Sequence, residues 1–147
     1  MNNINKIFDC ICNTLLALGL GVSFTLHGIG KFPLPPERMV DWFAGMGYKN
    51  PELVTSLVAI GEVAAGVGII VGGLLYLLNL IVTNRTFFII GDILTRLSAL
   101  GVVIIMIGAI LIAHSDWLIT QKLFMSEQIF LLLLGFYFTL KGNNRSF

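Results

Sequence analysis

The chain has 147 residues and a formal net charge of +1, and 56% of its residues are hydrophobic whereas only 12% are charged. A soluble domain is about half apolar and a quarter charged, so this composition, with a mean hydropathy of +0.92, indicates a protein of the lipid bilayer. The small net charge provides no basic surface for nucleic acid. We expect one domain over residues 1–147.

The first apolar stretch covers residues 11–30, and about 20 mostly apolar residues suffice for a transmembrane helix. It is longer than the core of a signal peptide and has no small-x-small cleavage site, so we expect a retained helix. Cys10 and Cys12 stand at its entrance. We interpret them as soft apolar residues rather than as a redox or metal motif.

Prolines and charged residues interrupt the apolar pattern after this stretch, where Trp42, Phe43 and Tyr48 suit a position at the membrane interface. Further spans are predicted at about residues 53–73, 94–113 and 123–140. The expected fold is therefore all-α, an integral membrane four-helix bundle. The balance of Lys and Arg in the loops favours, by a narrow margin, both termini inside.

An apolar insert, residues 74–93, separates the second and third spans and is cut by Asn79, by the sequence from Asn84 to Thr86 and by Asp92. Neither half is long enough to span a bilayer. We expect a helical hairpin lying at the interface, with a continuous, overlong second helix as the alternative. The insert is also our candidate surface for self-association or partner docking.

Five ionisable residues fall in the outer half of the membrane if successive helices alternate in direction. His27 and Lys31 end the first span, and His114 ends the third. At 1.5 Å per residue, Glu62 lies about 14 Å inside the second span and Glu127 about 6 Å inside the fourth. An uncompensated charge at such depth is costly, so we expect these side chains to meet as a ligand-binding or proton-active cluster.

Each member of this cluster also has a structural explanation. Taken singly, Lys31 could extend to the headgroups, His27 could make one interhelical hydrogen bond, and His114 could cap a helix. Together the residues can neutralise one another and hold protons near neutral pH. Arg96 begins the third span at the opposite face, where we expect it to anchor the cytoplasmic interface.

Small residues recur at helical spacing and predict close helix packing. Gly19 and Ser23 continue the stripe of His27 and Lys31, and Gly66 shares a face with Glu62. The two histidines lack the ligand spacing of a metal site, so we expect no metal. A haem held by His27 and His114 ranks last among the cofactors considered.

At these residues the chain resembles the DoxX family of small bacterial membrane proteins. The resemblance is carried by Phe24-x-Leu26-His27-Gly28-x-x-Lys31, the loop from Trp42 to Gly47, Glu62 with Gly66, Leu94-Thr95-Arg96-Leu97, His114 and Glu127. It implies a four-helix protein of the bacterial inner membrane with a link to quinone-dependent oxidoreductases. The insert, residues 74–93, is a departure from the typical member.

We therefore expect a redox-associated membrane subunit with a polar intramembrane site for a quinone or another small redox molecule, served by a membrane or peripheral redox partner. Whether the chain itself has enzymatic activity stays open. The alternative is a non-catalytic scaffold or assembly partner whose polar cluster is structural. A small transporter is a third hypothesis, and it would need water access to the cluster from both sides.

Overall fold

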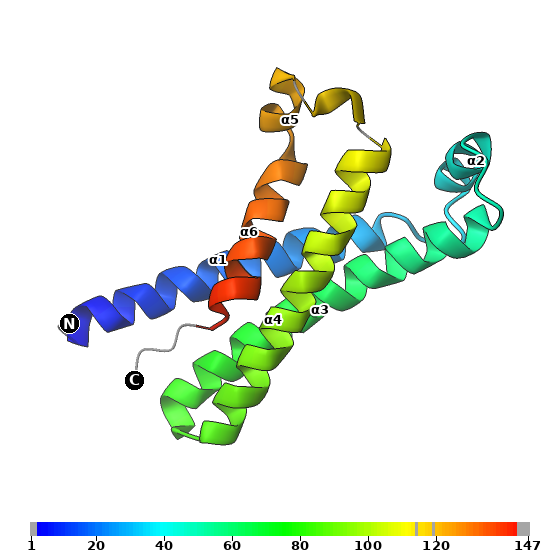
Figure 1. The fold of residues 1–147 in the computed structure, drawn as a ribbon. Coiled ribbons are helices and arrows are strands. Elements are labelled where there is room, and N and C mark those ends of the chain that lie inside the picture. The colour runs from blue at the N-terminus through cyan, green and yellow to red at the C-terminus, as the bar shows by residue number, and fades with distance from the viewer. Residues whose placement is uncertain (1–2, 114, 119, 144–147) are drawn as a thin grey trace.

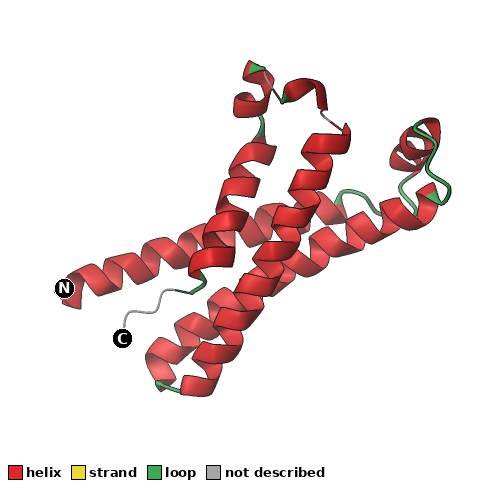
Figure 2. Cartoon of the chain, in the orientation of Figure 1, coloured by secondary structure: helices red, strands yellow, loops and turns green. Residues whose placement is uncertain are grey.

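The computed structural model describes residues 3–113, 115–118 and 120–143, and within these ranges its secondary structure is helical, without strands (Figure 2). The long helices are α1 (Asn3–Ile29), α3 (Pro51–Val82), α4 (Arg85–Gly108) and α6 (Glu127–Lys141). The short elements are α2 (Glu37–Gly45), the π-helical turn η1 (Ala109–Ala113), the 3₁₀ turn η2 (Ser115–Trp117) and α5 (Gln121–Met125). The predicted all-α class is confirmed.

The long helices pack in the order α1, α3, α4, α6, with the most extensive contacts between neighbours in that order. Figure 1 shows α4 and α6 steeply inclined to α1 and α3, so the two pairs diverge away from the α3–α4 turn. Helices α1 and α6 touch only sparsely. The closed four-helix bundle that the sequence suggested therefore stays a prediction.

Among the residues that the structure describes, three helical stretches are long and apolar enough to cross a membrane: Phe8–Ile29, Pro51–Asn79 and Arg85–Ala113. The fourth predicted span, residues 123–140, is wrong as a single helix. Ser126 has an extended backbone (φ −89°, ψ 152°) and separates α5 from α6. The 15 residues of α6 extend about 22 Å, less than the roughly 30 Å of a hydrocarbon core.

The insert, residues 74–93, does not form a hairpin separate from the spans. Helix α3 continues unbroken for 32 residues and α4 starts at Arg85, so the alternative of an overlong second helix is correct. The turn consists of Thr83, in the left-handed region, and Asn84, whose side chain accepts a hydrogen bond from the Thr86 amide at 2.9 Å. Asn79 does not break the helix, because a single asparagine costs little inside an apolar helix.

Glycines let the helices approach until their backbones touch. A Cβ atom on Gly66 of α3 would lie 2.5 Å from the Thr25 amide nitrogen and 2.6 Å from the Gly21 carbonyl oxygen of α1. A Cβ on Gly72 would lie 2.9 Å from the Gly91 carbonyl oxygen of α4. Real carbon atoms need more room, so glycine is required where α3 touches α1 at Gly66 and where α3 touches α4 at Gly72. We call these two close contacts the glycine seams.

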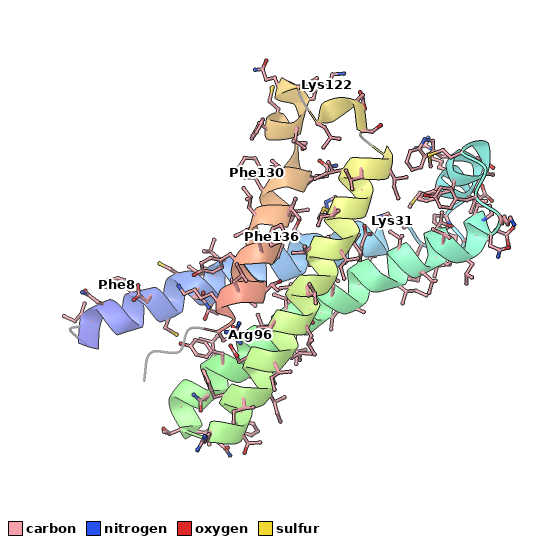
Figure 3. The ribbon with its side chains drawn as sticks, viewed as in Figure 1. Phe8, Lys31, Arg96, Lys122, Phe130 and Phe136 are labelled. Carbon is pink, nitrogen blue, oxygen red and sulfur yellow. The ribbon has the colours of Figure 1, made fainter. Side chains whose placement is uncertain are left out.

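A fully apolar layer lies at the centre of the helix packing. Phe24 and Leu20 of α1, Ile69 of α3, Val102 of α4 and Phe138 of α6 are each at most 1% exposed. Outward-facing side chains on the same helices are also apolar. Figure 3 labels Phe8, Phe130 and Phe136, which are 59%, 58% and 43% exposed. Apolar residues on both faces are typical of helices surrounded by lipid.

Candidate functional site

Lys31 and Glu62 form an ion pair between the end of α1 and the middle of α3. The Glu62 side chain is 4% exposed and that of Lys31 is 21% exposed. The close approach of α1 to α3 makes the pair possible, since a Cβ on Gly28 would lie 2.8 Å from the Ala59 carbonyl oxygen. The ammonium group compensates a carboxylate that would otherwise be buried without a partner.

His27 and Glu127 form a second, more open pair between α1 and α6. The His27 Nε2 atom lies 3.2 Å from Glu127 Oε1, and the two side chains are 35% and 61% exposed. Glu127 stands in the first turn of α6, where the helix dipole favours a negative charge. This pair joins two helices that otherwise have few contacts.

The two pairs are linked through the chain, because His27 is in the last turn of α1 and Lys31 follows the end of this helix by two residues. The structure thus places four of the five residues that the sequence singled out for the cluster in two separate pairs. The fifth, His114, lies outside the described residues. We call His27, Lys31, Glu62 and Glu127 the ion-pair cluster; its role in binding a ligand or moving protons is still a prediction.

Arg96 has a contact set that the sequence did not indicate. Its Nε donates to Asp92 Oδ2 at 2.9 Å. Its Nη atoms donate to the last carbonyl oxygens of α6, those of Thr139 (3.1 Å), Leu140 (2.7 Å) and Lys141 (2.7 Å). The guanidinium therefore caps the end of α6, where helical carbonyls lack partners (Figure 3). Anchoring at a membrane surface remains a prediction for this residue.

Asn143 completes this second polar group, and the sequence analysis did not single it out. Its backbone amide donates to Asp92 Oδ1 at 2.8 Å, and its side chain donates to the Gly72 carbonyl oxygen at 3.1 Å and to Thr95 Oγ1 at 2.9 Å. Asn143 is 1% exposed. Gly142, with a positive φ of 62°, ends α6 and turns the chain toward this position.

We call Asp92, Thr95, Arg96 and Asn143 the C-terminal network. The i, i+4 spacing of Asp92 and Arg96 on one helix is a sequence signal that could have found part of this network, but it does not identify Asn143. The network holds α6 against α3 and α4 at the end opposite to the ion-pair cluster. It therefore determines where Glu127, at the other end of α6, can lie.

The cysteines and histidines form no metal site in the described ranges. Cys10 is buried and packs with Tyr76 and Phe88, whereas Cys12 is exposed, and both thiols are free. Among the residues that the structure describes, no group of three or more His, Cys, Asp or Glu side chains is placed to hold a metal ion. The packing of Cys10 agrees with the interpretation of this thiol as an apolar contact residue.

Long apolar helices joined by glycine seams, with ion pairs between them, define a helical membrane protein. The sequence profile of the DoxX family matches residues 13–91, just over half of the chain, and the chain belongs to the DoxX family. No curated protein and no solved structure matches it significantly.

The extent of the family match corrects one expectation. It includes His27, Lys31 and Glu62, and it continues through most of the insert, ending at residue 91. The insert is therefore largely part of the family pattern rather than a departure from it. The match ends before Arg96 and Glu127. The family model therefore covers most of α1, all of α2 and α3, and the start of α4. It does not cover α6, which contacts His27 through Glu127 and Arg96 through its last carbonyl oxygens.

Proposed function

We propose that this DoxX-family protein is a redox-associated subunit of the bacterial inner membrane, with both termini inside, and that its ion-pair cluster binds a quinone or another small redox molecule. The observation that carries the proposal is the nearly complete burial of Glu62 against Lys31, which follows His27 of the more open pair by four residues along the chain. Intramembrane ionisable residues in such an arrangement commonly serve substrate or proton pathways.

The two pairs would have different roles, one in binding the ligand and the other in proton transfer. His27 and Glu127 are accessible, so the imidazole can donate a hydrogen bond to a carbonyl oxygen of the ligand. Lys31, just after the end of α1, and Glu62 of α3 form a second pair that can carry a proton. Reduction of a quinone consumes two electrons and two protons. A partner protein would supply the electrons, and the residues of this chain would position the ligand and transfer protons.

The apolar layer at Leu20, Phe24 and Ile69 supports a site that opens to one side only. These side chains are at most 1% exposed and lie between the ion-pair cluster and the C-terminal network. A transporter would need water to reach the cluster from both sides. We therefore favour one-sided proton exchange over transport.

The test measures quinone retention by the purified, full-length protein, using mass spectrometry of extracts and titration with a short-chain quinone. We expect His27→Gln and Glu62→Gln to weaken binding about 10- to 100-fold, which corresponds to one charge-assisted hydrogen bond. Glu52→Gln is the matched control, since Glu52 is an exposed carboxylate on the same helix as Glu62. The proposal fails if the wild type retains no quinone and if Glu62→Gln does not change the rate of quinone reduction by the electron-donating partner protein.

A second candidate function is a non-catalytic scaffold, and one observation favours it. Each member of the ion-pair cluster already has a polar partner within the chain, so the cluster can stabilise helix packing without a ligand. In that case Glu62→Gln lowers the yield of the assembled complex, while the turnover of the partner enzyme per assembled complex stays the same.

A further inference from the structure

A pocket of about 650 Å³ lies in the segment that joins α1 to α2, and residues 30–39 line it. Its volume falls in the range of about 300–1,000 Å³ that is typical of small-ligand sites, but it is an open surface hollow and not an enclosed cavity. Three ionisable side chains line it: Lys31, Glu37 and Arg38. The remaining lining is largely apolar, including Phe32, Leu34, Met39 and three prolines. A ligand for this pocket would therefore combine charged groups with apolar ones.

The charges of the pocket balance one another. Lys31 is already neutralised by Glu62. Glu37 and Arg38 are both exposed, and neither makes an ion pair or a side-chain hydrogen bond with any residue that the structure describes. One free carboxylate and one free guanidinium thus stand at adjacent positions. They match a ligand with one negative and one positive group better than they match a simple anion.

The location of the pocket points to the membrane surface. The first candidate span ends at Ile29, immediately before the pocket. Helix α2, which follows, buries Phe43, while Trp42 and Tyr48 remain about 40% and 39% exposed and pack edge-on against its ring. Partly exposed Trp and Tyr side chains favour the level of the lipid headgroups.

We propose that this pocket binds the headgroup of a phospholipid that carries a primary ammonium group. Arg38 would bind the phosphate, because guanidinium groups match phosphate geometry. Glu37 would accept hydrogen bonds from the ammonium group. Phe32 and Leu34 would contact the start of the acyl chains. The proposal does not depend on the redox function, since neither Glu37 nor Arg38 belongs to the ion-pair cluster.

The ammonium preference distinguishes this site from a general anion site. A choline headgroup has the same charges but no N–H donor for Glu37, and a glycerol headgroup leaves the carboxylate without a cationic partner. We therefore expect phosphatidylethanolamine to bind more tightly than phosphatidylcholine or phosphatidylglycerol. A charge-assisted hydrogen bond predicts a preference of about tenfold or more.

The experiment is native mass spectrometry of the detergent-purified full chain with equimolar phosphatidylethanolamine, phosphatidylcholine and phosphatidylglycerol that carry identical acyl chains. Wild type should retain mainly phosphatidylethanolamine. Glu37→Gln should abolish its advantage over phosphatidylcholine, and Arg38→Gln should weaken the retention of both. Lys49→Gln, an exposed lysine outside the pocket, is the control and should change nothing. Thermal unfolding establishes that each variant is folded.

Three results would overturn the proposal: equal retention of the three lipids, dominance of phosphatidylglycerol, or an unchanged preference in Glu37→Gln. Free phosphoethanolamine provides a further arm. If it displaces the lipid at equal concentration, the pocket recognises a soluble amine phosphate rather than a membrane lipid, and the proposed ligand is wrong.

Discussion

Replacing Lys31 with methionine removes the ammonium group that neutralises Glu62 while keeping a long apolar side chain at the end of α1. The Glu62 side chain is 4% exposed, so water cannot take over the role of the lost partner. Breaking a buried ion pair on one side typically costs about 3–5 kcal/mol. For a chain of this length, 1 kcal/mol shifts the melting temperature by about 2–4 °C. Lys31→Met should therefore lower it by roughly 6–20 °C.

The assay is thermal unfolding in one detergent, applied to Lys31→Met, Glu62→Gln and the double variant. Glu62→Gln should cost less than Lys31→Met, because it leaves a neutral side chain in the interior. The double variant should be more stable than the sum of the single changes predicts, by about 1–3 kcal/mol. Lys49→Met is the matched control for an exposed lysine. Additive effects within about 0.5 kcal/mol would refute the claim that the pair is coupled in the folded protein.

Three further predictions concern the seams, the C-terminal network and the cysteines. Gly66→Val should unfold the protein or destabilise it by more than about 3 kcal/mol by overpacking, whereas Gly19→Ala, with nothing within 4 Å of the added Cβ, should have little effect on the melting temperature. Arg96→Met should increase hydrogen exchange at the end of α6 and lower the free energy of unfolding by about 2–4 kcal/mol, since three carbonyl oxygens lose their donor. Unchanged hydrogen exchange at this end of α6 would contradict the capping role. A membrane-permeant thiol reagent should modify Cys12 quickly and Cys10 only on unfolding, because Cys10 is 6% exposed. Equal rates in the folded protein would show that Cys10 is not packed as described.

Local patterns along the chain predicted part of the fold correctly and part of it wrongly. Apolar runs identified the helices because a helix in lipid must be apolar around its circumference. The same runs predicted some helix ends wrongly. Asn79 was expected to interrupt a helix, but α3 continues through it. Ser126 was expected to lie within a helix, but it separates α5 from α6. Short polar residues in an apolar run can either remain helical or end the helix. Packing against neighbouring helices decides between these outcomes.

The sequence by itself determined that this is an all-helical membrane protein of the DoxX family. It also predicted that His27, Lys31, Glu62 and Glu127 share one half of the membrane, because the rise per residue sets depth along a helix. Only the tertiary structure decided which of them pair. It also gave Arg96 partners 43 to 45 residues away. The physical reason is that pairing depends on the rotation and crossing of each helix. Those are set by the glycine seams between helices, and no pattern within a single helix encodes them.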